Sequence, residues 1–290
     1  MDIGNRIKQF REEKNLTQKD IAKILEVEPG TISKYESNLI EPNIRSLIKL
    51  SDTFQISVDE LLKDEEVYFD LNEIDILATL QEQKEINLDG NLYHNTQIIF
   101  AYNSTHIEGN KLSKNQTKNI FETNTIPYEG TSLIHINDIF KIYNHFKLFN
   151  YMLDYAGEML TDKMIVEYYS ILENGIIDNI TEKQLEKNID KLLSWYNSLS
   201  KISFEKIIEF LVRFNKLKPF KNDNGIIGRM IAFKECLKND IIPFIVLDKD
   251  KLFYFRGLDE YKNKKDKNYL IDTLIDAQND YAKIIEKFLK

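Results

Sequence analysis

The 290-residue chain is 42% apolar, which is enough to form the core of one large domain or of two unequal domains. Its net charge of -8 argues against nonspecific coating of nucleic acid, although a local basic face could still dock DNA. The single cysteine, Cys236, excludes an internal disulfide and a cysteine-based zinc site. No apolar run matches a membrane span, and MDIGNRIKQF lacks the apolar stretch of a signal peptide, so we expect a cytoplasmic protein without membrane contact.

The first segment, residues 1–64, has the periodicity of five short helices. The apolar side chains that share one stripe of the first helix are Ile3, Ile7 and Phe10. Thr17 precedes the second helix, where its hydroxyl and the Asp20 carboxylate can form a capping box. A tight turn, VEPG, leads to a third helix that begins near Thr31. Two short helices joined in this way predict a helix-turn-helix.

Residues 16–62 resemble the phage-repressor (XRE) family of helix-turn-helix domains over their whole length. The residues that carry the resemblance are Leu16, Thr17, Gln18, Ala22, Ile32, Ser33, Glu36 and Pro42. Ser57 and Glu60 form a further capping box, which predicts the start of the last short helix. The resemblance implies that this segment binds a double-stranded DNA operator. The alternative is a helical bundle that serves only dimerisation.

The side chains that we expect at the DNA lie at the start of the second helix and along the third. They are Gln18, Gly30, Thr31, Ser33, Lys34 and Asn38. Gln18 at a helix start can bond a phosphate, and the exposed turns of the third helix suit the major groove. The first fifty residues carry nine Lys or Arg against eight Asp or Glu, which is little positive charge for each domain. We therefore expect a homodimer on a palindromic site.

A charged join at residues 63–70, KDEEVYFD, is the expected domain boundary. We therefore assign residues 1–65 to the helix-turn-helix domain and residues 66–290 to a second domain. The second domain is helical by its periodicity, so the predicted fold class is all-α throughout.

Several helices of the second domain are defined by their caps. Ser113 and Gln116 form a capping box, and Ser203 is the predicted cap of the helix FEKIIEFLVRFNKL. Two more helices are predicted over residues 164–180 and 181–199. The buried stripe of FEKIIEFLVRFNKL is predicted to be Ile207, Ile208, Leu211 and Phe214.

Two motifs of the second domain carry the functional signal. Residues 102–110, YNSTHIEGN, contain Ser104, Glu108 and Gly109 in the pattern (S/T)xxxE(G/N). Alone, such a glutamate is more often a helix-terminal carboxylate paired with a nearby base. Residues 218–229, KPFKNDNGIIGR, form a tight polar loop that opens an apolar helix. The backbone amides at such a helix start suit an anion, such as a phosphate.

Together these motifs resemble the Fic (Fido) family, whose signature HxFx(D/E)GNGRxxR carries AMP from ATP to a protein hydroxyl. The residues that agree with the signature are Pro219, Phe220, Asn224, Gly225 and Arg229. Lys218 stands in place of the catalytic histidine, Asn222 in place of the acidic metal ligand, Asp223 in place of the first glycine and Ile226 in place of the first arginine. The resemblance also implies that Ser104, Glu108 and Gly109 form an inhibitory helix end, in which Glu108 pairs with Arg229 and displaces the γ-phosphate of ATP. Family members also carry a β-hairpin flap for the target peptide, but ENGIIDNITEKQ leaves little room for one.

The substitutions weaken the case for catalysis. A lysine such as Lys218 suits holding a phosphate better than accepting a proton, and Asn222 offers Mg²⁺ only a neutral carbonyl. The residues expected to bind a nucleotide or another anion are Lys218, Asn222, Asp223, Asn224, Gly225 and Arg229. No metal ligand set is predicted, and the four histidines are expected to be surface or packing residues.

The sequence therefore predicts a DNA-binding regulator whose Fic-like domain is catalytically silent and serves nucleotide sensing or dimerisation. The alternative is a protein adenylyltransferase inhibited by Glu108, for which ATP and Mg²⁺ would be the cofactors and Lys218 the catalytic residue. One half of a toxin and antitoxin pair is a third hypothesis.

Overall fold

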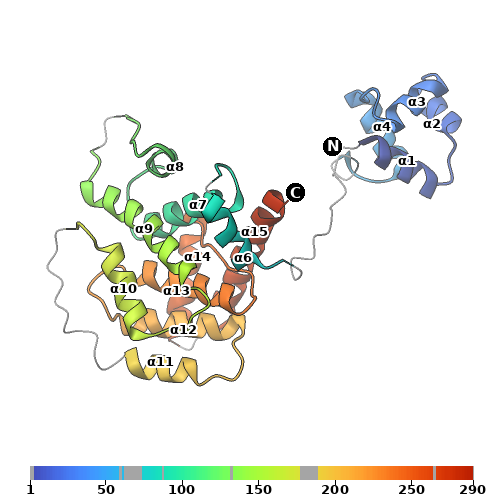
Figure 1. Ribbon diagram of the computed structural model, residues 1–290. Coiled ribbons are helices and arrows are strands. Elements are labelled where there is room, and N and C mark those ends of the chain that lie inside the picture. Colours follow the sequence, from blue (N-terminus) through green and yellow to red (C-terminus); the bar gives the residue numbers. More distant parts are fainter. Residues whose placement is uncertain are drawn as a thin grey trace. The chain divides into compact units, whose positions relative to one another are not determined.

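The computed structural model describes residues 3–58, 61, 74–86, 88–130, 133–176, 189–263 and 266–289 (Figure 1). The chain divides into two compact units, Met1–Phe69 and Asp70–Lys290. Within the described residues both units consist of helices and contain no strand, which confirms the predicted all-α class. None of the described helices is long and apolar enough to cross a bilayer. The predicted boundary between residues 65 and 66 lies outside the described residues.

The first unit packs its helices around a small apolar core. The described helices are α1 (Ile3–Glu13), α2 (Gln18–Leu25), α3 (Pro29–Glu36) and α4 (Ile44–Phe54). The predicted stripe of α1 is confirmed, since Ile3 and Ile7 are buried and Phe10 packs against the same core. Glu60 lies outside the described residues, and with it the predicted cap of the last short helix.

The helix-turn-helix begins with the predicted capping box. Thr17 Oγ1 accepts a hydrogen bond from the Asp20 amide at 3.2 Å, and Asp20 Oδ2 accepts one from the Thr17 amide at 2.8 Å. The third helix, however, begins at Pro29, earlier than the predicted start near Thr31. Proline suits the first helical position because it has no N–H to satisfy and its φ is already helical. Gly30 therefore lies inside α3.

Glu36 ties α1, α2 and α3 together inside the first unit. Its Oε1 accepts a hydrogen bond from Arg11 Nε at 2.6 Å, and its Oε2 accepts from Arg11 Nη2 at 3.2 Å and from Gln18 Nε2 at 2.8 Å. The hydrogen bond to Glu36 raises the pKa of Arg11 above its ordinary value. Because a two-pronged pair of this kind is both strong and directional, Glu36 fixes the placement of α3.

We predict that Glu36→Ala destabilises the first unit by about 1–3 kcal/mol, since it leaves the Arg11 guanidinium without its main acceptor. Hydrogen exchange of the α1–α3 amides in the full-length protein measures the loss. The matched control is Glu26→Ala, which removes an exposed ion pair with Lys49 of 2.8 Å and should change exchange much less. Equal effects of the two substitutions would contradict the role of Glu36.

The second unit surrounds one buried helix, α13 (Asn224–Lys238). The helices that precede it are α6 (Ile76–Ile86), α7 (Leu92–Ile107), α8 (Lys114–Thr123), α9 (Ile136–Asp154), α10 (Asp162–Leu172), α11 (Ile189–Asn197) and α12 (Phe204–Leu217). Those that follow are the short η3 (Asp248–Asp250), α14 (Lys251–Lys262) and α15 (Asn268–Leu289). Figure 1 shows α13 in the middle of this unit, where it packs against α7, α9, α10 and α12. All of its residues except Gly225 and Lys238 are buried.

The caps predicted at Ser113 and Ser203 are confirmed, whereas the cap predicted from Thr181 and Gln184 lies outside the described residues. Ser113 and Gln116 form both hydrogen bonds of the capping box at the start of α8. Ser203 Oγ accepts from the Lys206 amide at the start of α12. The predicted stripe of α12 is also buried, namely Ile207, Ile208, Leu211 and Phe214. Local hydrogen bonding and periodicity therefore define these elements.

The helix predicted over residues 164–180 is wrong at its end, because α10 stops at Leu172. Asn144 Nδ2, from α9, donates to the Leu172 carbonyl at 2.9 Å and to the Asn174 carbonyl at 2.7 Å. Gly175 follows with a φ of 78°, a left-handed conformation that commonly ends a helix. The helix therefore stops where Asn144 binds these two carbonyls. The start of the helix predicted over residues 181–199 and most of the expected flap region fall on residues 177–188, outside the described ones.

Candidate functional site

Arg229 lies at the centre of the predicted inhibitory contact. Its Nη2 donates to Glu108 Oε1 at 2.9 Å and to the Ser104 carbonyl at 2.8 Å, and its Nε donates to Ser104 Oγ at 3.2 Å. Arg229 is only 2% exposed, so these contacts take the place of water at its Nε and Nη2 atoms. The structure therefore forms the ion pair between Glu108 and Arg229 that the motif implies. Gly109, at a φ of 103°, then turns the chain away from the end of α7.

The Glu108 carboxylate also lies against the first turn of α13. A Cβ atom added to Gly225 would lie 1.9 Å from Glu108 Oε1 and 3.1 Å from Arg229 Nη1. Gly225 is therefore required for the close approach of the carboxylate. Because the amides at a helix start and the positive end of the helix dipole favour negative charge, Glu108 occupies an anion position at α13.

The loop before α13 is held in shape by Asn224. Its Oδ1 accepts from the Phe220 amide at 3.0 Å, and its Nδ2 donates to the Phe220 carbonyl at 2.7 Å. The Phe220 ring stacks on Tyr169 with ring centroids 4.0 Å apart. Asp223, the residue before α13, adopts a left-handed conformation with a φ of 59°. The anion position is thus built on a preformed turn.

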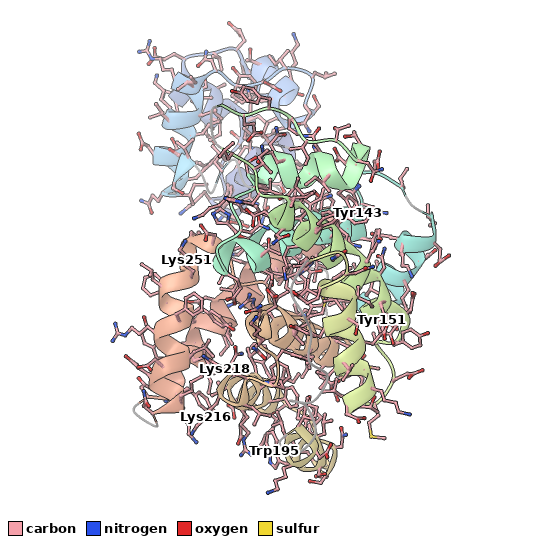
Figure 2. All side chains as sticks on the ribbon, turned by 90° about the vertical axis from the view of Figure 1, so that its left-hand side faces the viewer. Tyr143, Tyr151, Trp195, Lys216, Lys218 and Lys251 are labelled. Carbon is pink, nitrogen blue, oxygen red and sulfur yellow. The ribbon has the colours of Figure 1, made fainter. Side chains whose placement is uncertain are left out.

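The residues predicted to bind an anion do not all lie at one place in the structure. Only Gly225 and Arg229 lie at the Glu108 carboxylate. The amide of Asn224 is used within the loop, and Asn222 is exposed. Lys218 stands in place of the catalytic histidine of the family. It is exposed and adopts a left-handed conformation at the end of α12, next to Lys216 (Figure 2).

Asp223 belongs to an ion cluster that the sequence analysis missed. Lys141 Nζ lies 2.5 Å from Asp223 Oδ2 and also donates to Glu173 Oε1. Burial, together with a hydrogen bond to Asp223, raises the pKa of Glu173 to about 7, while the ammonium of Lys141 opposes this shift. Lys141 comes from α9 and Glu173 follows α10, so no motif links them to the loop and no local signal could have found them.

The residues of the loop do not fit the Mg²⁺ that the family resemblance implies. Asn222, in the position of the acidic ligand, is neutral and exposed, and the neighbouring Asp223 carboxylate is bound by the Lys141 ammonium. Across the part of the chain that the structure describes, no three His, Cys, Asp or Glu side chains are grouped so that they could hold a metal ion. Divalent cations of this type prefer several carboxylate oxygens.

Of the four histidines, His145 and His106 pack against aromatic rings, whereas His94 Nε2 pairs with Glu122 Oε1 at 2.8 Å. His145 is fully buried and packs edge-on against Phe100, with ring centroids 5.1 Å apart. Burial and the charge of Arg229 lower the pKa of His145 to about 3, so it is neutral. His106 is partly exposed and stacks on Tyr102 at 5.0 Å.

In the first unit, the predicted DNA-reading face of α3 is open to solvent. The predicted contact residues that are exposed or partly exposed on this helix are Gly30, Thr31, Ser33 and Lys34. Two other predicted residues have internal hydrogen bonds: Gln18 Nε2 donates to Glu36, and Asn38 Oδ1 accepts from the Gly4 amide at 2.8 Å. Asn38 therefore caps the start of α1, a role that its place in the sequence did not indicate.

These features define the first unit as a helix-turn-helix DNA-binding domain, and the helix-turn-helix family HTH_3 matches residues 7–61. The chain is 36% identical over 90 residues to the HTH-type transcriptional regulator ImmR of Bacillus subtilis, covering 29% of this chain and 70% of ImmR. It is 42% identical over 67 residues to the HTH-type transcriptional activator BcrR of Enterococcus faecalis, covering 23% of this chain and only 33% of BcrR. The chain therefore belongs to the XRE-type helix-turn-helix transcriptional regulators.

The second unit is similar in fold to solved Fic-domain proteins. A Fic-domain signalling protein from Bacteroides thetaiotaomicron matches with a TM-score of 0.55 and 16% identity, over 72% of this chain and 93% of that protein. Fic-1 from C. elegans matches with a TM-score of 0.58 and 14% identity, over 98% of each chain. At this level of identity the likeness establishes the fold alone.

We predict that Gly225→Ala expels the Glu108 carboxylate, because the new methyl group would overlap Glu108 Oε1. The substitution should destabilise the protein in urea unfolding, but much less so in a Glu108→Gly background, with a coupling of about 0.5–3 kcal/mol between the two sites. Gly157→Ala is the control, since a Cβ there meets no atom within 4 Å. Additive effects of Gly225→Ala and Glu108→Gly would contradict the contact.

Proposed function

We propose that this protein is a transcriptional regulator whose Fic-like unit binds a nucleotide or another phosphate-bearing ligand and transfers no AMP. The observation that carries the proposal is the Glu108 carboxylate at the start of α13, bonded to the buried Arg229 at 2.9 Å. A negative group already occupies the anion position, so an anionic ligand can compete for the same partners. The regulator would act as a homodimer on a palindromic operator.

The absence of AMP transfer follows from the substituted positions. A lysine that acts as a general base is usually buried, but Lys218 is exposed. The loop also lacks a free carboxylate for a metal ion, because Asp223 is bound by Lys141. Proton abstraction and metal-assisted phosphate chemistry therefore both lack their usual groups.

Ligand binding would act by breaking the contact between α7 and α13. The guanidinium of Arg229 is buried and needs a negative partner in either state, so a phosphate that displaces Glu108 would take over this pairing. Glu108 is 31% exposed on its side chain and can move into water. The end of α7 would then lose its tie to α13, and we propose that this change alters operator affinity.

The DNA-binding part is tested on a double-stranded oligonucleotide selected by the full-length protein from a random library. Lys34→Ala should weaken binding about 5- to 150-fold, as expected for the loss of one base or phosphate contact worth about 1–3 kcal/mol. Lys8→Ala, an exposed lysine on α1, is the control and should change affinity little. If the two variants bind equally well, α3 is not the reading helix.

The ligand-binding part is tested with ATP. Glu108→Gly should bind ATP at least about tenfold more tightly than wild type in calorimetry, because the competing carboxylate is gone and Arg229 is free. Glu129→Gly, an exposed loop carboxylate, is the control. In the wild type, ATP should shift the affinity for the selected oligonucleotide. An affinity for ATP that Glu108→Gly leaves unchanged would contradict the competition.

The retained ion pair also favours a second candidate, an adenylyltransferase that Glu108 inhibits. ATP labelled at the α-phosphate separates the two functions. We expect no label on the protein or on a bacterial lysate with either wild type or Glu108→Gly. Label that appears only with Glu108→Gly would establish the transferase instead.

A further inference from the structure

Lys141, Glu173 and Asp223 form a largely buried ion cluster in the second unit. The side chains of the three residues are 15%, 4% and 12% exposed. Lys141 Nζ lies 2.5 Å from Asp223 Oδ2 and donates to Glu173 Oε1 as well. One ammonium therefore binds two carboxyl groups that come from distant parts of the chain.

The surrounding structure holds the backbone at both acidic residues. Asn144, one turn after Lys141 on α9, holds the end of α10 through the carbonyls of Leu172 and Asn174, and Glu173 lies between these two residues. Asp223 is held at the start of α13 in a left-handed conformation. Because this part of the backbone is held by contacts other than Lys141, we expect the two side chains to stay close together if the ammonium is removed.

The position of this cluster bears on the chemistry of the anion site. Asp223 immediately precedes α13, and Gly225 within the first turn touches the Glu108 carboxylate. A carboxylate next to a phosphate site normally repels the ligand unless a cation lies between or beside them. Here the cation is an ammonium group supplied by the protein itself.

We propose that Lys141 takes the place of a divalent metal ion at this loop, so that anions bind there without Mg²⁺. The inference rests on the proposed ligand-binding function, but it makes a separate claim about how the charge of Asp223 is neutralised. The lysine carries a single charge and three N–H donors, and Asp223 and Glu173 accept two of them. With both carboxyl groups engaged and Asn222 neutral, a metal ion has no free carboxylate to bind.

The first experiment uses Mn²⁺ alone, followed by electron paramagnetic resonance of the full-length protein. Wild type should bind Mn²⁺ at least about tenfold more weakly than Lys141→Met, because the substitution leaves two neighbouring carboxyl groups without their cation. Lys147→Met, an exposed lysine on the same helix, is the matched control and should behave as wild type. Mn²⁺ binding by wild type that equals binding by Lys141→Met would overturn the proposal.

A second variant tests the assignment in a protein that keeps its fold. Lys141→Met together with Glu173→Gln removes the excess buried negative charge and should melt close to wild type. It should also lose the Mn²⁺ site that Lys141→Met gains. If this double variant is folded and still binds Mn²⁺ as Lys141→Met does, Glu173 is not a partner and the assignment fails.

The second experiment measures ATP binding in EDTA and in excess Mg²⁺. Wild type should bind with affinities that agree within about threefold, while Lys141→Met should bind at least about tenfold more tightly with Mg²⁺ than in EDTA. Binding by wild type that disappears in EDTA would overturn the role of Lys141 and leave the ligand-binding function standing. No ATP binding by wild type in either condition would count against the proposed function, whereas the Mn²⁺ measurement still decides what Lys141 does.

Discussion

The second unit depends on burying the charge of Arg229 without leaving it unpaired. Its helix, α13, is enclosed by its neighbours, and a guanidinium in such a place is tolerated only when hydrogen-bond acceptors surround it. Ser104 and Glu108 supply these acceptors from a single helix end. The register between α7 and α13 is therefore set by one charged side chain. The same helix also buries an ion pair between Lys234 Nζ and Glu235 Oε1, which lie 2.7 Å apart. Arg229 is therefore not the only buried charge on α13 that is paired with a carboxylate.

This requirement limits what could replace Glu108 at Arg229 in the proposed function. Removing Glu108 from Arg229 without a replacement would leave an uncompensated buried charge, which costs about 3–5 kcal/mol. A neutral ligand offers no such compensation, whereas a phosphate restores both the charge and the hydrogen bonds. The start of α13 adds its own preference for negative groups. Under the proposed function, a ligand must therefore supply the negative charge that Glu108 supplies to Arg229 in this structure.

The sequence predicted those parts of the fold and site whose partners lie within a few residues or within one recognised motif. The capping boxes at Thr17 and Ser113 are local hydrogen bonds, and the pairing of Glu108 with Arg229 followed from two motifs read together. The end of α10 was missed because Asn144, far away in sequence, caps it. Lys141 was missed for the same reason, since an isolated lysine on a helix gives no sign of the carboxyl groups that the fold brings to it.

Two of the substituted positions of the loop have structural partners in the second unit. Ile226, in place of the first arginine, is 1% exposed and belongs to the main apolar core. Asp223, in place of the first glycine, accepts the Lys141 ammonium, and its left-handed conformation is one that aspartate tolerates better than most residues. Each of these two residues has a structural partner, so restoring one family residue would disturb packing or pairing. If the unit transfers no AMP, as we propose, recovering this activity would require several coordinated changes, whereas the proposed anion binding would require only that Glu108 leave Gly225 and Arg229.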